Sequence, residues 1–338
     1  MSAYYVSVKY NTILKGDVSV KVDALFMTAP KKIEIRQIEV GEPKYDEIQI
    51  EIKANGICKW DQNLFKGNSL VAEFPFTFGH EPAGVVIKVG EGVTGFKKGD
   101  SVFCCGGTDS MAQVVNMPAR CAVVITEPVS DYSLWAAEPI CCVVNSVANV
   151  PFCPGDDVLL VGAGYMGLLK IHALNKMLRG RLIVLDLDDR RVALAKEFGA
   201  DEAYNANSSE AKKRIEQIVA NGGIDLVIEC SGEEEGFNTA IKCTKQSGVL
   251  ELFGWQRGLR TFDGTPWHMD GIRIYNSAPN IERFYEAQRI KQTEKLVACG
   301  VFDQTKLVTH RTNYKYAQEA LERAIAKDDG YIKGTITF

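Results

Sequence analysis

The first part of the chain alternates hydrophobic and polar residues, a pattern that predicts strands. Between residues 46 and 54, isoleucines and an alanine alternate with Glu, Gln and Lys, which is the period of a strand with one buried face. Shorter runs follow at 84–89 and 101–104, separated by glycine-rich turns. Upstream, segments 4–13 and 18–22 flank Lys15-Gly16-Asp17 and are predicted to form a hairpin. We therefore expect a β-rich first domain.

The pattern changes after Pro154. Short apolar runs at 158–161, 182–185, 224–228 and 249–253 alternate with helical stretches, which predicts a parallel sheet with crossover helices. Beyond Asn280 we expect a polar helix, then a helix and a closing strand at 331–338. The apolar stripe of that second helix is Ala317, Ala320, Leu321, Ala324 and Ile325. The chain is thus predicted to be an α/β protein.

Length and charge restrict the class of protein. The 338 residues are enough for about two domains. Lys and Arg total 39 against 43 Asp and Glu, a net charge of −4, and the longest basic runs are pairs, so we expect no nucleic-acid partner. Neither a membrane-spanning apolar segment of about 20 residues nor a secretory signal pattern is found. We expect a cytoplasmic protein with a small-molecule substrate and no membrane partner.

A glycine-rich turn follows the run at 158–161. Gly162, Gly164 and Gly167 form G-x-G-x-x-G between a predicted strand and a predicted helix. The first glycine permits a tight turn, the second lets the backbone approach a pyrophosphate, and the third lets helix and strand pack closely. The backbone N–H groups around Tyr165 and Met166 would face the phosphates at the helix N-terminus. This segment is a candidate dinucleotide site.

An acid ends the next apolar run, at Asp186, nineteen residues beyond the last glycine of the turn. A carboxylate there accepts hydrogen bonds from the adenosine ribose and repels a 2′-phosphate, so we predict NAD rather than NADP. The alternative is a surface aspartate after an ordinary glycine turn. Arg191 has two interpretations, a lid over the adenine or a solvated helix charge.

Four residues in the β-rich part are candidate metal ligands: Cys58, His80, Glu81 and Glu138. Thiolate, imidazole and carboxylate groups all bind zinc, and three protein ligands with one open position are typical of catalytic zinc. Taken singly, each has an ordinary alternative as a buried apolar residue, a core histidine or a surface charge. Glu138 lies among apolar residues, where a carboxylate usually needs a cation.

The chain resembles the zinc-dependent medium-chain dehydrogenases over about residues 23–338. The motifs that carry the resemblance are Gly79-His80-Glu81 with Gly84, Gly90 and Val93, Gly99-Asp100 with Val102, the three glycines of the turn, and Thr309-His310-Arg311. The resemblance places Cys58, His80 and Glu81 on catalytic zinc positions. It places Glu138-Pro139 where the polyol-dehydrogenase branch, similar to sorbitol dehydrogenase, carries a glutamate.

The resemblance also implies the domain organisation. A GroES-like β-rich catalytic domain would comprise residues 1–150 and 281–338, and a Rossmann domain with a doubly wound parallel sheet would comprise residues 151–280. The family's four-cysteine lobe would follow Val102 and is absent from the sequence, so one zinc per chain is implied. We expect a homodimer or homotetramer.

One position departs from the family pattern. Two residues after the zinc cysteine the family carries Ser or Thr, which passes the alcohol proton outward, whereas this chain has Trp60. An indole N–H donates a hydrogen bond but accepts no proton, so that relay does not run in its usual form. Glu138, Lys59 and Asp61 are the candidates for the acid–base role, with Glu138 first. We expect Asp61 to orient neighbouring backbone.

The function implied is reversible oxidation of a secondary hydroxyl of a polyol, sugar or sugar derivative to a ketone, with one zinc and NAD. Trp60, Trp255 and Trp267 would offer flat faces to a sugar, or would be ordinary packing. One alternative is elimination or epimerisation through a transient ketone, and another is a simple secondary-alcohol dehydrogenase. A catalytically silent NAD-binding protein is a further alternative, which the complete set of candidate ligands disfavours.

Overall fold

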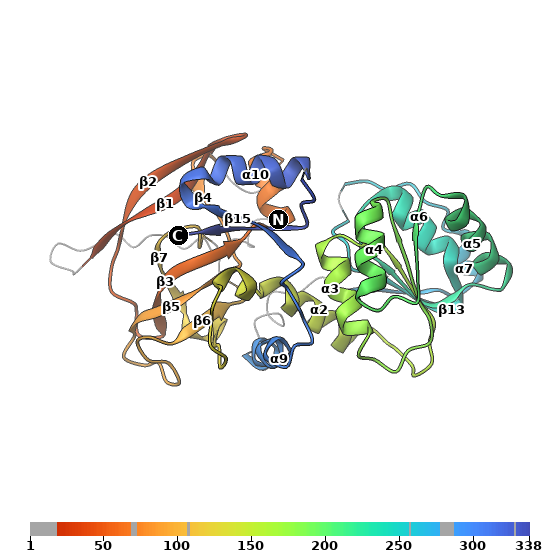
Figure 1. Ribbon diagram of the computed structural model, residues 1–338, viewed down its shortest axis with the longest axis horizontal. Coiled ribbons are helices and arrows are strands. Elements are labelled where there is room, and N and C mark those ends of the chain that lie inside the picture. The colour runs from red at the N-terminus through yellow and green to blue at the C-terminus, as the bar shows by residue number, and fades with distance from the viewer. Residues whose placement is uncertain (1–18, 69–72, 107–108, 257, 278–286, 328) are drawn as a thin grey trace. The chain divides into compact units, whose positions relative to one another are not determined.

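The computed structural model describes residues 19–68, 73–106, 109–256, 258–277, 287–327 and 329–338. They fall into two compact units (Figure 1). The first unit comprises Met1–Cys141 and Ile281–Phe338, and the second comprises Cys142–Asn280. The division falls inside helix α2 (Glu138–Asn149). Described segments from before and after the second unit in the sequence therefore form the first unit.

The main sheet of the first unit has seven strands in the order β15-β16-β3-β5-β6-β8, with β7 also paired to β3. Their bounds are β3 (Glu47–Gly56), β5 (Pro82–Val89), β6 (Ser101–Cys104), β7 (Val114–Pro118), β8 (Ala122–Val124), β15 (Val308–Asn313) and β16 (Lys333–Thr337). The alternation at 46–54 is that of β3, whose Ile48, Ile50 and Ile52 are buried. Strand β16 runs antiparallel to β3, so the end of the chain lies beside the strand that leads to Cys58.

A smaller sheet has the order β2-β1-β4, with β1 (Val20–Ala29), β2 (Lys32–Val40) and β4 (Phe76–Thr77). The predicted hairpin lies mostly outside the described residues; of its second arm, 20–22 belong to β1. Strand β1 instead pairs with β2, which was not predicted. The apolar positions of β2 shift by one between Ile35 and Ile38, so its alternation is broken.

The helices of the first unit are short. They are α1 (Lys59–Phe65), α9 (Ala287–Ala298) and α10 (Ala317–Ala326), with 3-10 turns η1 (Ala119–Cys121), η2 (Tyr132–Trp135) and η3 (Tyr314–Tyr316). As predicted, α10 buries an apolar stripe; its Ala320 and Leu321 pack with Phe65 and Ile336 in one core. That core fixes α1 against the C-terminal strand.

The second unit is built on six parallel strands in the order β11-β10-β9-β12-β13-β14, which confirms the predicted α/β class. Their bounds are β9 (Val158–Val161), β10 (Leu182–Asp186), β11 (Glu202–Asn205), β12 (Ile224–Glu229), β13 (Thr244–Leu252) and β14 (Arg273–Asn276). The sequence predicted four of these. The two edge strands, β11 and β14, were missed because each is four residues long and only one of their eight side chains is fully buried.

Helices cover both faces of the parallel sheet. They are α3 (Tyr165–Leu174), α4 (Asp189–Glu197), α5 (Ser209–Ala220), α6 (Glu234–Cys243) and α7 (Thr265–Met269). Helices α3 and α4 lie on one face, and α5 and α6 lie on the other (Figure 1). Strand order reverses between β9 and β12, and a ligand of such a sheet binds at the carboxyl ends of the strands beside that point. None of the described helices is long and apolar enough to cross a bilayer.

Candidate metal centre and dinucleotide site

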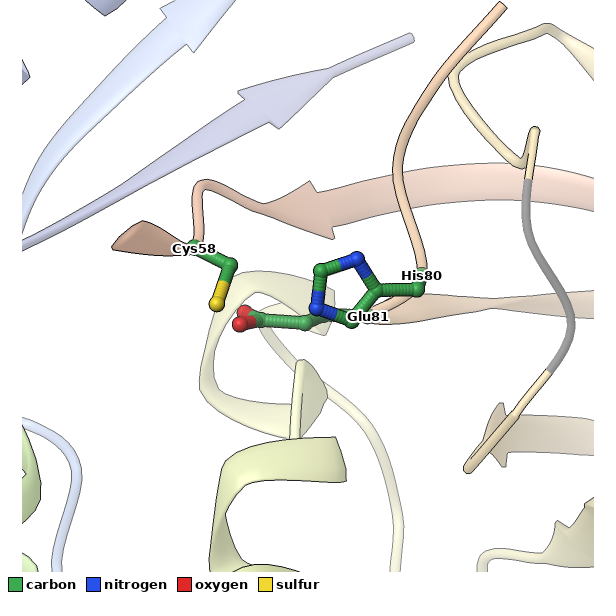
Figure 2. Close-up of side chains that lie close together, drawn as sticks. All are labelled: Cys58, His80 and Glu81. Atoms are coloured by element: carbon green, nitrogen blue, oxygen red, sulfur yellow. The ribbon is translucent and has the colours of Figure 1, made fainter. Parts of the chain in front are cut away.

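Three of the predicted ligands lie together in the first unit. One ligand atom each from Cys58, His80 and Glu81 falls within 4.8 Å of the other two. Cys58 is the N-cap residue of α1, and His80 and Glu81 directly precede β5. Figure 2 shows one ring nitrogen of His80 facing the Glu81 carboxylate and the Cys58 sulfur. The group is thus assembled from two segments joined by the β3–β5 pairing.

Glycines make room for this group. A Cβ on Gly56 would lie 1.8 Å from Oε2 of Glu81, so only glycine allows the carboxylate to lie there. Gly79 has φ +92°, and a Cβ on it would lie 2.5 Å from Cγ of Met111. Asn55, which is fully buried, accepts a hydrogen bond from the backbone N–H of Glu81 at 3.2 Å. The backbone around the ligands is therefore fixed by its neighbours.

Asp61 lies directly behind the ligands. Its Oδ2 accepts a hydrogen bond from the backbone N–H of Cys58 at 2.8 Å, which closes the first turn of α1. Its Oδ1 lies 3.8 Å from Nδ1 of His80. A carboxylate behind the imidazole is the usual arrangement for a metal-ligating histidine. The expectation that Asp61 orients backbone agrees with its bond to Cys58.

The last strand contributes a cation. Nζ of Lys333 forms an ion pair with Glu81 and donates a hydrogen bond to the carbonyl of Ile57 at 3.1 Å. The Lys333 side chain is 4% exposed and that of Glu81 is fully buried. Sequence reasoning missed Lys333, although a lysine in the apolar closing strand was a usable signal. Asn55 carried no such signal, because its role depends on the pairing of β3 with β5.

The site is electrostatically coupled. Burial raises the pKa of the Cys58 thiol, and the neighbouring His80 opposes this. Burial acts to lower the pKa of His80, but Asp61 and Cys58 outweigh it and the pKa lies well above its usual value. Burial, reinforced by Glu81, raises the pKa of Glu138 to about 7, against the lowering effect of His80. The charge on each of these side chains therefore shifts the pKa of its neighbours.

The residues fit a metal ion. The donor set is a thiol, an imidazole and a carboxylate, which together suit zinc. Both carboxylate oxygens of Glu81 are buried and accept no hydrogen bond among the described residues. Lys333 balances the one negative charge of Glu81, but carboxylate lone pairs remain unused beside the thiol and the imidazole. A metal ion held by Cys58, His80 and Glu81 would use these lone pairs and would stabilise a thiolate at Cys58.

The other predicted site residues of this unit lie around the group. Glu138, the first residue of α2, is 8% exposed and falls outside the three-residue cluster, although it interacts electrostatically with His80 and Glu81. Trp60 is partly buried and packs against the core that contains Phe65. Lys59, the first residue of α1, is exposed.

The glycine turn of the second unit has the geometry that a dinucleotide needs. Gly162 has φ +100°, and a Cβ on it would lie 2.7 Å from the backbone nitrogen of Ser231. A Cβ on Gly167 would lie 2.1 Å from the carbonyl oxygen of Gly162, so this glycine permits the close packing of α3 on the turn. Gly164 is the N-cap of α3 and has open space beside it. Tyr165 and Met166 begin the helix, as the sequence predicted.

Asp186 ends β10 beside this turn. Its Oδ2 accepts a hydrogen bond from the backbone N–H of Ala163 at 2.6 Å, and its Oδ1 accepts one from Asp188 at 2.9 Å. Nη1 of Arg191 lies 3.7 Å from Oδ1 of Asp186, and the arginine side chain is 17% exposed. Arg191 is thus an ion-pair partner of Asp186 rather than a solvated helix charge. The open space at Gly164 leaves room for a pyrophosphate. The Asp186 carboxylate beside the turn fits an adenosine ribose whose 2′-hydroxyl carries no phosphate.

The other two tryptophans proposed to face a sugar, Trp255 and Trp267, belong to the second unit. Trp267 stacks on Phe262 with ring centroids 4.3 Å apart and packs against the core of the second unit. Trp255 is 42% exposed and follows β13. The packing interpretation therefore holds for Trp267.

The fold and the two sites define a class. A parallel sheet with a glycine turn and an acid on the second strand, joined to a β-rich unit with a buried thiol, imidazole and carboxylate, is the architecture of a metal-dependent dinucleotide oxidoreductase.

Comparison with known proteins agrees with this class. The family "Alcohol dehydrogenase GroES-like domain" matches residues 44–127, and "Zinc-binding dehydrogenase" matches residues 166–292. The chain belongs to the zinc-dependent medium-chain dehydrogenases, as the resemblance of its motifs predicted, and it is an oxidoreductase of that family.

Individual relatives span nearly the whole chain. A sorbitol dehydrogenase of Bacillus subtilis is 26% identical over 89% of this chain and 93% of its own length. D-arabinitol dehydrogenase 1 of Uromyces fabae is 25% identical over 91% and 95%. A solved oxidoreductase of unknown specificity from Escherichia coli superposes with a TM-score of 0.85 at 22% identity, covering 94% of this chain and 99% of its own.

Proposed function

We propose that the protein oxidises a secondary hydroxyl of a polyol, a sugar or a sugar derivative to a ketone, reversibly, with NAD and one zinc per chain. The observation that carries the proposal is the buried group of Cys58, His80 and Glu81 in a chain of this family. The names of its sorbitol and arabinitol dehydrogenase relatives support a polyol substrate.

The chain's own residues have separable roles in this proposal. When bound, zinc supplies Lewis acidity toward the substrate oxygen, and NAD supplies the hydride acceptor. Cys58, His80 and Glu81 would hold the metal, while Asp61 would keep the imidazole oriented. Lys333 balances the charge of Glu81, so that the buried ligand set is not left with an excess of negative charge.

Glu138 has the remaining role near the metal. Trp60 stands where the family carries a hydroxyl, and its indole has no proton acceptor. Of the other two acid–base candidates, Asp61 is fully buried and accepts a hydrogen bond from backbone, and Lys59 is exposed. Glu138 remains the first candidate, either as a fourth ligand or as the group that takes up the hydroxyl proton.

NAD is the proposed cofactor of the second unit. Gly162, Gly164 and Gly167 would receive the pyrophosphate at the start of α3. Asp186 would accept hydrogen bonds from the adenosine ribose, and Arg191 beside it would reduce the repulsion of the nearby phosphates. The preference for NAD over NADP rests on the Asp186 carboxylate.

Two alternatives within this fold give different products. Elimination or epimerisation through a transient ketone would regenerate the oxidised cofactor, and a simple secondary-alcohol dehydrogenase would act on short alcohols. The names of the polyol dehydrogenase relatives do not favour either alternative. The first alternative follows from Trp60, which stands where the family carries the hydroxyl that passes the proton.

A substrate screen tests the proposal. Purified protein with zinc and NAD is offered polyols, sugar acids and short secondary alcohols, and NADH absorbance is followed. We expect NADH production with the highest kcat/KM on a polyol or sugar derivative. Turnover of short alcohols alone would identify a simple alcohol dehydrogenase, and product formation without net NADH would identify elimination or epimerisation.

Trp60 is the proposed substrate-facing wall. Trp60→Ala should raise KM about tenfold for a polyol and much less for a short secondary alcohol, because only the larger substrate covers the lost apolar area. Trp60→Phe, which keeps a flat ring, is the matched control. Equal losses on all substrates, together with a lower Tm, would show that Trp60 only packs against the core.

We also propose a cytoplasmic homodimer or homotetramer. Sedimentation of the purified protein measures the subunit number, and a monomer would contradict this part of the proposal.

A further inference from the structure

The second unit contains a buried ion pair that the proposed chemistry does not use. Nζ of Lys170, in α3, lies 3.1 Å from a carboxylate oxygen of Glu251, in β13. The two side chains are 2% and 1% exposed. Ser146 of α2 is fully buried and bridges them, with hydrogen bonds to both. Three elements of the unit therefore meet at one polar cluster.

Stability does not account for this cluster. Every residue of α3 from Gly167 to Leu174 is buried, so Lys170 stands in an otherwise enclosed helix. Glu251 stands in an apolar strand between Leu250 and Leu252. Removing two charges from water costs several kcal/mol per ion, and apolar residues of similar volume often serve stability as well or better. The position of the pair in the sheet indicates a different role.

The pair lies just behind the carboxyl edge of the sheet. Glu251 is the penultimate residue of β13 and is in register with Ile228, the penultimate residue of β12. Cys230 and Phe253 follow the two strands and are partly exposed. Nζ of Lys170 lies 4.8 Å from the centre of the Phe253 ring, a cation–π contact. The ion pair thus contacts Phe253, the residue that follows β13 at the edge.

That edge is where the second half of a dinucleotide has to lie. The pyrophosphate belongs at the start of α3, and the adenosine ribose belongs at Asp186 on β10, to one side of β9. The nicotinamide half then extends to the other side, over the carboxyl ends of β12 and β13. Ser231, which touches the glycine turn at Gly162, begins this side.

We propose that Lys170 and Glu251 are positioning residues for the nicotinamide half of the dinucleotide: their ion pair, bridged by Ser146, holds Phe253 at the edge over which that half lies. The edge is then formed before the cofactor arrives, which lowers the cost of ordering it on binding. The inference rests on the proposed NAD cofactor and goes beyond it, because neither residue touches the glycine turn or Asp186 in any described hydrogen bond.

Two ligands and one double variant test the positioning role. The variant Lys170→Met with Glu251→Leu replaces the pair by apolar side chains, a change that usually leaves the stability of a fold unchanged or raises it. NADH has the nicotinamide half and ADP-ribose lacks it. We expect the double variant to bind NADH about tenfold more weakly than the wild type, with the Kd for ADP-ribose and the Tm nearly unchanged. Binding is measured by NADH fluorescence and by calorimetry.

The control is an ion pair between β12 and β13, at the ends of these strands opposite to the carboxyl edge. Lys245→Met breaks the ion pair of Lys245 with Asp225, and both dissociation constants should stay at the wild-type values. If the double variant fails to fold, Ser146→Ala removes only the bridge and should raise the NADH Kd about threefold, again without effect on ADP-ribose.

Each other outcome contradicts the positioning role. Equal weakening of both ligands would mean that the whole unit is distorted. Unchanged NADH binding in a folded double variant, or in Ser146→Ala if that variant is used, would mean that the pair only packs. A wild-type protein that binds neither ligand would overturn the cofactor assignment itself, and the positioning role with it.

Discussion

Two buried glutamates, one in each unit, show how its surroundings decide whether a carboxylate is suited to bind a metal ion or to fix the backbone. Glu81 and Glu229 are both fully buried. Glu229 accepts hydrogen bonds from the backbone N–H groups of Ser231 at 2.7 Å and Gly232 at 2.9 Å, and from the side chains of Ser231 and Gln256. Glu81 accepts none among the described residues and has the Lys333 ion pair instead.

The difference follows from what each carboxylate can still bind. The oxygens of Glu229 are saturated by donors that tie the loop after β12 to the loop after β13, so this side chain fixes backbone. Burial raises the pKa of Glu229, and the hydrogen bonds from Ser231 and Gly232 counteract that effect. Glu81 keeps free lone pairs beside a thiol and an imidazole. A buried carboxylate without donors is suited to a cation, whereas one with donors is a structural anchor.

The largest expected effect concerns the metal. Wild-type protein should contain about one zinc per chain, and His80→Ala should lower kcat by about 10³-fold or more, because a ligand of a catalytic Lewis acid is lost. Zinc is measured by mass spectrometry and turnover by NADH absorbance. The circular dichroism spectrum should be unchanged, since His80 is not part of an apolar core. Activity that survives the substitution would contradict the metal mechanism.

The two glutamates can be compared directly. Glu81→Gln should reduce zinc content and lower kcat by about 10²-fold, because a neutral amide is a weaker ligand. Glu229→Gln should leave zinc content unchanged and destabilise the fold by about 1–3 kcal/mol, because an amide cannot accept all of the hydrogen bonds. Mass spectrometry measures the zinc content of both variants, and urea denaturation measures their free energy of unfolding. The same response from both would remove the distinction between ligand and anchor.

A third carboxylate, Asp186, extends the comparison to the cofactor. Like Glu229, it accepts hydrogen bonds from backbone N–H groups, but it lies at the proposed ribose site. Asp186→Ser should reduce the preference for NAD over NADP about tenfold, because the ribose loses an acceptor and a 2′-phosphate is no longer repelled. The ratio of kcat/KM for the two cofactors measures this. A wild-type preference for NADP would show that the assigned role of Asp186 is wrong.

The smallest effect concerns a carboxylate near the surface. The hydrogen bonds of Arg214 lower the pKa of Glu202. A carboxyl with a lowered folded-state pKa adds stability above its unfolded pKa of about 4.3, and loses it as the pH falls through the folded value. Glu202→Gln should therefore cost about 0.5 kcal/mol at pH 7, and the cost should shrink as the pH falls below about 4.3 toward the lowered folded-state pKa. Thermal unfolding at several pH values tests this, with the exposed Glu91→Gln as control; a cost that does not vary with pH would contradict the sign.

Local patterns were enough for the main elements. The isoleucines of β3 face one core, and the apolar runs of β9, β10, β12 and β13 form the centre of the parallel sheet, because a buried strand needs apolar side chains along its length. Strands β11 and β14 were not predicted. Each is an edge strand that is stabilised by pairing with its neighbour, and four residues are too few to show a hydrophobic pattern.

The sequence by itself determined the chemistry that is available: a thiol, an imidazole and two carboxylates in the β-rich part, and a glycine turn followed by an acid in the other. Only the tertiary structure decided that Cys58, His80 and Glu81 lie together while Glu138 lies outside their cluster. It also decided that Lys333, from the end of the chain, pairs with Glu81, because β16 lies beside β3. Contacts between segments far apart in sequence depend on strand pairing and packing, which no local pattern of residues records.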